Sequence, residues 1–381
     1  MIRPIRLPLL PILLLLLFSA SGAHAQGTPT APTIAAKSYL LYDFQSTQML
    51  VAHDADERIE PASLTKLMTA YVVFDALKQK TLKLDQNVPV SQRAWKAEGS
   101  RTFIEPRMPV TVDELLHGVI VQSGNDASIA LAEAVAGSEE SFALLMNKEA
   151  KRLGLTNTNF TNSTGLPDPQ HYSTAADMAK LAAAIIRDHP EYYPLYSQKE
   201  FTYNKIKQPN RNRLLWSDPS VDGMKTGHTK NAGYCLVTSS RRGERRLISV
   251  VLGASSSRAR AAESQKLLNF GFQFYDTVRL YQKGQQVANL RVWKGSTDTV
   301  NAGFERDLYF TLPKGQAEKL KATLESQQPL VAPVTTGQRV GTMRITLDGK
   351  PLTEVPVVAI ETVELGNIFA RGWDAMRLFF Q

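Results

Sequence analysis

Three short motifs in this chain hold the residue types that a serine enzyme needs, and they follow one another along the sequence. They are Ser63-Leu64-Thr65-Lys66, Ser123-Gly124-Asn125 and Lys225-Thr226-Gly227. A single S-x-x-K carries little weight, because ordinary serine and lysine frequencies give roughly one or two in a chain of this length. All three motifs together predict a serine nucleophile whose proton is taken by a lysine rather than by a histidine.

The first motif lies at the start of an apolar helical pattern that runs from Leu64 to Leu77 and predicts a mostly buried helix. Residues three apart share a helix face, so Lys66 can reach the hydroxyl of Ser63. Lys66 can accept a proton only when neutral, and burial plus a second cation such as Lys225 would lower its pKa. The Ser63 amide at the helix start could stabilise an oxyanion. The alternative is that Ser63 caps the helix and Lys66 is solvated.

The second motif, Ser123-Gly124-Asn125, separates two apolar stretches that both predict helices. Together with the first motif it indicates a catalytic hydroxyl and an amide. Ser123 could relay a proton to the leaving group, and Asn125 could hold Lys66 and the backbone of a substrate. The alternative is an ordinary polar turn that caps the second helix.

The third motif continues as His228 and Thr229 and is followed by an apolar segment that predicts a strand. Gly227 has no side chain, so another backbone can approach closely there. A substrate peptide could add to this edge, with the Thr226 and Thr229 hydroxyls and the Lys225 charge meeting its carboxylate. The alternative is a glycine turn at the start of a strand.

The order and spacing of the motifs resemble the serine-type D-Ala-D-Ala carboxypeptidases, the low-molecular-weight penicillin-binding proteins of peptidase family S11. Residues 123–127, 165–173, 225–229 and 260–268 carry the resemblance, which is strong over residues 35–275. Gly124 stands where the S-D-N form of the second motif has aspartate. The resemblance implies Ser63 as acylated nucleophile and Lys66 as base. It implies Ser123 and Asn125 as the groups of the second motif and Lys225 as the cation of the third. The Ser63 and His228 amides would form the oxyanion hole, and Arg260 would meet the terminal carboxylate of the substrate.

The resemblance also implies the reaction and its partners. The enzyme would remove the terminal D-alanine from peptidoglycan pentapeptide stems through a Ser63 acyl-enzyme, and β-lactams such as penicillin would acylate the same serine. A DD-endopeptidase is the alternative within the family. A β-lactamase is disfavoured because residues 166–173 contain no E-x-x-L-N segment. A cell-wall-binding protein with a vestigial site is disfavoured by the intact motifs, and a solvated surface role for Arg260 stays open.

The first residues predict export. Arg3 and Arg6 precede an apolar run from Leu7 to Phe18, and small residues end at Ala25, which is typical of a cleaved signal peptide over residues 1–25. Without those two arginines, 42 basic residues face 36 acidic ones, a net charge of +6. This modest excess suits a protein beside anionic lipid or cell-wall polymer and predicts no nucleic-acid partner. We therefore expect a peripheral protein at the periplasmic face of the bacterial inner membrane.

The sequence contains no motif of a metal site or of a serine–histidine triad. The six histidines form no H-E-x-x-H, and no G-x-S-x-G is present. The single Cys235 lies in an apolar segment that predicts a strand, and we expect neither a metal nor a cofactor. The sequence leaves a homo-oligomer open.

The pattern of apolar residues predicts several parts. After a linker over residues 26–35, residues 36–280 mix strands and long helices, as in an α/β domain of the β-lactamase and transpeptidase type, with an antiparallel sheet flanked by helices. Residues 281–362 predict a small all-β sandwich, with a hairpin at Asp348-Gly349. Residues 365–381 predict an amphipathic helix that lies in a membrane interface. The alternative for this helix is packing against the β domain.

Overall fold

The computed structural model describes residues 29–379. The predicted signal peptide, residues 26–28 of the predicted linker and residues 380–381 of the predicted tail lie outside the described residues. Within them, the first part of the chain is built on a five-stranded sheet in which every neighbouring pair is antiparallel. In spatial order its strands are β2 (Met49–His53), β1 (Ser38–Asp43), β9 (Arg245–Ala254), β8 (Gly233–Arg242) and β7 (Val221–Thr229).

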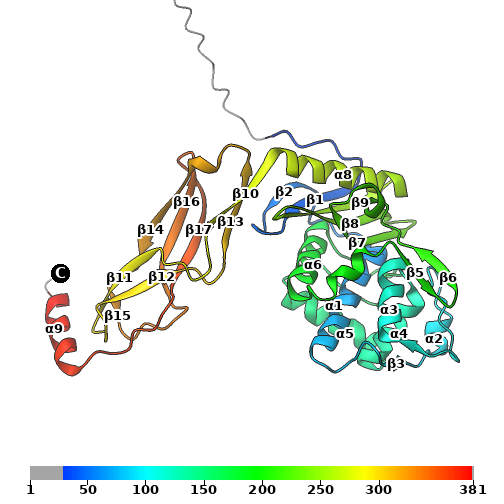
Figure 1. The fold of residues 1–381 in the computed structure, drawn as a ribbon, viewed down its shortest axis with the longest axis horizontal. Helices are drawn as coiled ribbons and strands as arrows, with labels where there is room; N and C mark the ends of the chain where they lie inside the picture. Colours follow the sequence, from blue (N-terminus) through cyan, green and yellow to red (C-terminus); the bar gives the residue numbers. More distant parts are fainter. Residues whose placement is uncertain (1–28, 380–381) are drawn as a thin grey trace, which may run out of the picture. The chain divides into compact units, whose positions relative to one another are not determined.

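Helices cover this sheet on both faces. Successive residues of each strand point to opposite sides, and apolar side chains lie on both sides of this sheet. Leu40 and Val237 belong to a core shared with the helices around α1, whereas the adjacent Leu41 and Leu236 belong to a core shared with α8. Figure 1 shows α8 on one side of β1, β8 and β9, and α1 and α6 on the other. The helices are α1 (Lys66–Lys78), α2 (Gln92–Trp95), α3 (Val112–His117), α4 (Asn125–Ala136), α5 (Glu139–Arg152), α6 (Ala175–Asp188), α7 (Leu214–Ser217) and α8 (Ser257–Phe274).

Shorter elements connect these helices. The 3₁₀ turn η1 (Ala62–Thr65) directly precedes α1, the π-helical turn η2 (Gly118–Gln122) lies between α3 and α4, and the 3₁₀ turn η3 (Tyr193–Ser197) follows α6. Two small antiparallel pairs complete this part: β3 (Asn87–Val88) with β4 (Val110–Thr111), and β5 (Glu200–Tyr203) with β6 (Ile206–Pro209).

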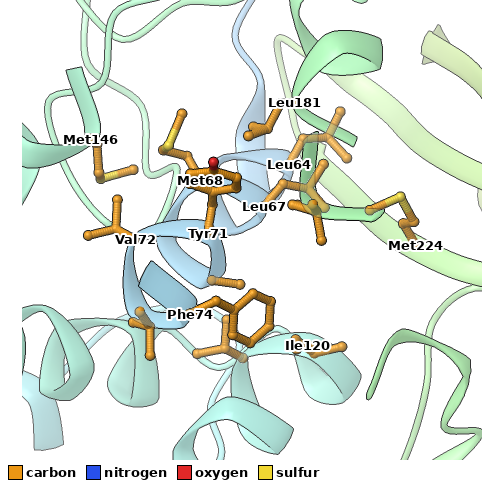
Figure 2. Packing of buried hydrophobic residues seen from close by; sticks show 14 of the residues in the cluster. Leu64, Leu67, Met68, Tyr71, Val72, Phe74, Ile120, Met146, Leu181 and Met224 are labelled. Carbon is orange, nitrogen blue, oxygen red and sulfur yellow. The ribbon is translucent and has the colours of Figure 1, made fainter. Parts of the chain in front are cut away.

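Helix α1 is the central helix of the first part. Its residues from Lys66 to Leu77 are buried except for Asp75, so the helix is apolar on nearly every side. Figure 2 shows the packing around it, with contributions from η2, α5, α6 and β7. The labelled side chains are Leu64, Leu67, Met68, Tyr71, Val72, Phe74, Ile120, Met146, Leu181 and Met224. A helix enclosed in this way holds its first residue, Lys66, in a fixed place.

The second part is all β, as predicted. Strand β10 (Tyr275–Tyr281) pairs with β13 (Leu308–Pro313), and residues of both strands share one apolar core with a six-stranded sheet. The order of that sheet is β14 (Leu320–Ser326), β16 (Arg339–Leu347), β17 (Lys350–Ala359), β12 (Thr299–Gly303), β11 (Ala288–Trp293) and β15 (Leu330–Val331). A short 3₁₀ turn, η4 (Ala317–Lys319), precedes β14.

The hairpin prediction is confirmed in this part. β16 and β17 are joined by Asp348 and Gly349 alone, and both residues have a positive φ, at 52° and 75°. A two-residue turn of this type needs two left-handed residues, which is why the Asp-Gly pair predicts it.

The change from α/β to all-β architecture comes at Tyr275, where α8 passes directly into β10. The apolar pattern predicts that residues 275–280 belong to the first part, but β10 pairs with β13, a strand of the second part. No glycine or proline marks this transition, so the apolar pattern of α8 runs into that of β10 without a visible break.

The last helix is α9 (Ile368–Phe379). The side chains of Ile368, Phe369, Trp373 and Met376 are 79%, 89%, 57% and 56% exposed. One polar contact joins the helix to the β-rich part, where the Lys294 amide donates to Asp374 Oδ2 at 2.6 Å. Among the described residues, no helix has the length and hydropathy needed to cross a bilayer.

Candidate active site

The nucleophile candidate Ser63 lies in the 3₁₀ turn η1, one turn before α1 begins at Lys66. The apolar pattern predicts Ser63 inside the first turn of the helix itself. The difference does not separate the two side chains, because Lys66 Nζ donates to Ser63 Oγ at 3.2 Å. Ser63 is half-buried, whereas Lys66 is 1% exposed.

Two further acceptors fix the amine of Lys66. Its Nζ donates to Asn125 Oδ1 at 2.7 Å and to the carbonyl oxygen of Thr164 at 2.6 Å. The orientation of the Asn125 amide is set by its Nδ2, which donates to the carbonyl of Glu98 at 2.6 Å. A neutral amine has two N–H groups, and these two acceptors can take both. Its lone pair is then left facing Ser63 Oγ, as a proton acceptor requires.

Burial and, to a smaller extent, the nearby cation of Arg211 lower the pKa of Lys66 to about 7. The sequence predicts Lys225 as the second cation, whereas in the structure the cation that lowers the pKa of Lys66 is Arg211. Burial drives the pKa of Lys225 well below its usual range, and repulsion from Lys66 lowers it further. Both lysines therefore lie in surroundings that favour the neutral amine.

The second and third motifs meet at a hydrogen bond. Lys225 Nζ donates to Ser123 Oγ at 2.8 Å and to the carbonyl of Thr226 at 3.1 Å. Ser123 has a left-handed backbone with φ 69°, a conformation that is uncommon for serine and is often found at functional sites. The structure thus contains two Lys–Ser pairs, Lys66 with Ser63 and Lys225 with Ser123.

Gly124 is required by the packing of the second motif. A Cβ at this position would lie 2.1 Å from Thr102 Oγ1 and 3.0 Å from the Thr102 amide nitrogen. The next residue but one, Asp126, is fully buried, and its carboxylate accepts from the amides of Thr102 and Phe103 at 2.8 and 2.7 Å. The motif therefore fastens the loop around Thr102 at close range, which leaves no room for a side chain at residue 124.

Gly227 allows a close approach, but by a different partner from the one expected. A Cβ there would lie 3.0 Å from the carbonyl oxygen of Pro61 and 3.3 Å from Leu64 Cγ. The backbone against Gly227 is thus that of the turn that carries Ser63. Because Gly227 has no side chain, β7 can pack against the turn that carries Ser63, which we call the nucleophile turn. This packing sets the distance between the first and third motifs.

A cleft of about 760 Å³ opens above these groups. Six of the predicted site residues line it: Ser63, Ser123, Thr226, Gly227, His228 and Arg260. Lys66, Asn125 and Lys225 are buried behind this lining at 1%, 5% and 2% exposure. Thr229 is not brought together with them, because its hydroxyl donates to Glu60 Oε2 at 2.9 Å and accepts from the Ala232 amide.

Arg260 is held by the strand that carries the third motif. Its Nη1 donates to the carbonyl of Gly227 at 2.9 Å, and its guanidinium lies 5.6 Å from the ring centre of Tyr234. The side chain is 6% exposed, and burial lowers its pKa to about 10. A buried, anchored guanidinium at a cleft wall contradicts the solvated alternative for this residue.

The structure brings in residues that the sequence analysis did not single out. Arg211 lines the cleft. Asp126 supports the loop around Thr102, and the Thr164 carbonyl binds Lys66. His171 fastens the nucleophile turn, because its Nδ1 accepts from the Thr161 amide and its Nε2 faces Thr65 Oγ1 at 2.7 Å. Of these, only Asp126 and His171 fall in segments that the sequence analysis quoted, and nothing in the sequence indicated their contacts.

In the part of the chain that the structure describes, no group of three or more histidine, cysteine, aspartate or glutamate side chains is arranged to hold a metal ion.

Comparison with known proteins shows the family. Residues 25–256 match the family model of D-alanyl-D-alanine carboxypeptidase, peptidase S11, and residues 275–365 match the C-terminal domain of penicillin-binding protein 5. The chain belongs to the D-alanyl-D-alanine carboxypeptidase family. The predictions of family, fold class and enzyme class are confirmed.

Individual relatives agree with this family assignment. The chain is 48% identical over 374 residues to D-alanyl-D-alanine carboxypeptidase DacC of Escherichia coli, covering 96% of this chain and 94% of that protein. Penicillin-binding protein 5 of Haemophilus influenzae is 44% identical with a TM-score of 0.85, over 88% of this chain and 99% of that one. Penicillin-binding protein D2 of Listeria monocytogenes, solved in the ampicillin-bound form, is 30% identical with a TM-score of 0.60, over 64% of this chain and 100% of that one.

The packing at Gly124 gives a testable prediction. Gly124→Ala should destabilise the protein by roughly 1–3 kcal/mol, because the new methyl group overlaps Thr102 Oγ1. Thr102→Ala removes that atom, so the double variant should regain part of the loss; Asp126 Oδ1, at 2.8 Å from the added Cβ, limits the recovery. Urea unfolding of the single and double variants measures both effects. Gly372→Ala, where the added Cβ meets nothing within 4 Å, is the matched control. Equal stability of Gly124→Ala and the unsubstituted protein would contradict the steric argument.

Proposed function

We propose that this enzyme releases the terminal D-alanine from peptidoglycan pentapeptide stems through an acyl-enzyme on Ser63. One observation carries the proposal: Lys66 Nζ, buried and held by two other acceptors, lies 3.2 Å from Ser63 Oγ. This arrangement supplies a serine with a base that is neutral near physiological pH. Membership of the carboxypeptidase family supplies the substrate class.

Acylation uses the first Lys–Ser pair. Ser63 Oγ attacks the carbonyl carbon between the two D-alanines while its proton passes to Lys66 Nζ. The amides of Ser63 and His228 stabilise the oxyanion of the tetrahedral intermediate. The C–N bond then breaks, and the leaving amine takes a proton through Ser123, which Lys225 holds at 2.8 Å. An ester on Ser63 and free D-alanine result, and attack by water on the ester restores the serine.

The third motif and Arg260 bind the end of the substrate. The peptide lies along β7, where Thr226 lines the cleft, and its terminal carboxylate meets Arg260. Because Gly227 Cα packs against the nucleophile turn, the strand that aligns the peptide is fixed relative to Ser63. Thr229 acts through this strand, since its hydroxyl is bound to Glu60. β-Lactams enter the same cleft and acylate Ser63.

Substitution of the base tests this mechanism. Lys66→Arg should abolish acylation of Ser63 by penicillin and by a D-Ala-D-Ala peptide, because arginine stays protonated in proteins. Intact-protein mass spectrometry after exposure to penicillin measures the adduct, and thermal unfolding shows whether the variant is folded. Lys78→Arg, at the exposed end of the same helix, is the matched control. Near-normal acylation of a folded Lys66→Arg protein would remove Lys66 from the role of base.

The pKa of Lys66 predicts a pH dependence. Below pH 7 the amine is protonated and cannot accept the Ser63 proton, so the acylation rate should rise with pH, with a midpoint near 7, and then level off. Arg211→Gln removes a cation that lowers this pKa, so its midpoint should move to higher pH. Stopped-flow acylation across pH 5–9 measures both profiles. A rate independent of pH over this range, or a midpoint that moves to lower pH in Arg211→Gln, would contradict the assignment.

We propose further that the protein is exported and lies on the periplasmic face of the inner membrane, held by residues 365–381. The exposed apolar side chains of α9 support this proposal. Arg371 and Arg377 lie on the same helix, and interfacial helices combine such cations with aromatic and apolar side chains. The Arg377 guanidinium is 5.2 Å from the Trp373 ring centre. The bond between Lys294 and Asp374 occupies a single polar residue of the helix and leaves the apolar side chains uncovered.

Two changes in the tail test the anchor. Truncation after Glu364 should release the protein from membranes without loss of activity on a small soluble peptide, since Ser63 lies in a different part of the fold. Arg371→Glu with Arg377→Glu should weaken binding to anionic vesicles by about 1 kcal/mol for each lost cation. Vesicle co-sedimentation measures both, and Lys283→Glu with Arg306→Glu is the charge-matched control. Continued pelleting of the truncated protein, or its unfolding, would make the helix a structural element of the β-rich part.

A further inference from the structure

One wall of the cleft is a short segment in which inward and outward side chains alternate. Asn210 and Asn212 are 7% and 0% exposed, whereas Arg211 and Arg213 are exposed and line the cleft. In the sequence Asn-Arg-Asn-Arg, both amides thus lie inside and both guanidiniums lie outside.

The two asparagines fix the backbone that carries the arginines. Asn212 Nδ2 donates to the carbonyl of Gly223 in β7 at 2.9 Å, and Asn212 Oδ1 accepts from the Leu214 amide at 3.2 Å. Asn210 Nδ2 donates to the carbonyl of Gln198 at 2.9 Å, and Asn210 Oδ1 accepts from the Asn212 amide. The segment is thus fastened to the strand that carries Lys225 and Thr226. Such fastening limits the freedom that the arginines lose when they bind a ligand.

In the described part of the chain, the charges of Arg211 and Arg213 are not paired with an acidic side chain. Among the described residues, neither guanidinium forms a hydrogen bond or an ion pair, whereas Arg242 and Arg246 elsewhere on the same part pair with Asp218 and Asp222. The described residues that line the cleft include three arginines and no aspartate or glutamate. Arg211 and Arg213 also lower the pKa of Arg260, so their charges act on one region. Concentrated positive charge without a protein partner points to an anionic ligand.

The terminal carboxylate of the substrate does not use all of this charge. In the proposed function it meets Arg260, which the Gly227 carbonyl already holds. The cleft of about 760 Å³ is the size of a drug-like ligand site rather than that of a dipeptide end. Trp216, 49% exposed, lines the same wall three residues after Arg213 and offers an apolar surface for the aliphatic part of a longer peptide.

We propose that Arg213, together with Arg211, binds a second carboxylate of the stem peptide, on a residue that precedes the two D-alanines. This inference rests on the proposed function. Two residues of a stem can supply the carboxylate: a diaminopimelate in third position, through its side-chain end, or the γ-linked D-glutamate in second position. The subsite makes the enzyme select stems by charge, through a guanidinium pair suited to the planar carboxylate.

Matched pentapeptides test the subsite and identify its ligand. Release of D-alanine by the mature chain is measured, with kcat and KM separated, on three peptides. The first has diaminopimelate and a free D-glutamate carboxylate; the second has L-lysine in third position; the third has the D-glutamate carboxylate amidated. Unsubstituted enzyme should favour the peptides that retain the bound carboxylate. The peptide on which activity falls identifies its source.

Substitution of Arg213 completes the test. Arg213→Gln should raise KM by roughly 10-fold on peptides with the bound carboxylate, with kcat unchanged, and by less than about twofold on the peptide without it. Arg213→Lys keeps the charge and should recover part of the loss. Arg258→Gln, an exposed arginine of α8 outside the cleft lining, is the matched control and should leave the preference intact. Thermal unfolding shows that each variant is folded.

Three results would overturn the inference. Equal kcat/KM of the unsubstituted enzyme on all three peptides would show that no second carboxylate is bound. An equal loss on all three peptides in Arg213→Gln would show that Arg213 acts on the fold or on the terminal carboxylate instead. Failure of the unsubstituted enzyme to release D-alanine from any peptide would reject the proposed function, and the subsite with it.

Discussion

The active site depends on one constraint, which is that Lys66 is buried with its amine surrounded by three oxygen atoms and no carboxylate within hydrogen-bond distance. Burial of a lysine among apolar side chains disfavours its charge, and the charges of Asp126 and Glu139, which favour the protonated amine, offset only part of this effect. The proposed base therefore depends on position: the packing around the start of α1 encloses the lysine stem, while Asn125 and the Thr164 carbonyl occupy the N–H groups. The Thr164 segment is itself fixed, because Thr69 Oγ1 donates to the Ser163 carbonyl at 2.6 Å.

The rest of the first part can be understood as support for this arrangement. Lys66 comes from α1, Ser123 and Asn125 from the junction of η2 and α4, and Lys225 from β7, so each motif belongs to a different element. Close backbone approaches set their distances: Gly227 against the Ser63 turn, and Gly124 against Thr102. Contacts between backbones change little when side chains move. They therefore keep the fixed geometry that the hydrogen bonds of this site, between 2.6 and 3.2 Å long, require.

The sequence predicted the local geometry better than the contacts between distant segments. The i, i+3 spacing of Ser63 and Lys66 implied their contact, and Asp348-Gly349 implied a two-residue hairpin, because both depend on residues close in the chain. Arg211, Asp126 and the Thr164 carbonyl act on residues dozens of positions away, so no spacing rule finds them. Gly227 was correctly read as a place of close approach, but its partner, the Pro61 carbonyl, lies more than 160 residues earlier. The start of β10 was missed because helix and strand patterns join there without a turn residue.

The cations of the cleft have two effects that at first oppose each other. Arg211 lowers the pKa of Lys66, yet a cation that binds a substrate carboxylate loses much of its repulsion once that carboxylate arrives. The relative size of the causes of the low Lys66 pKa resolves this conflict. Burial is the larger reason for the low pKa of Lys66, and this burial comes from the protein itself, so a carboxylate that arrives in the cleft does not remove it. The neutral base is thus maintained from inside the fold, which leaves the arginines of the wall available for binding the substrate.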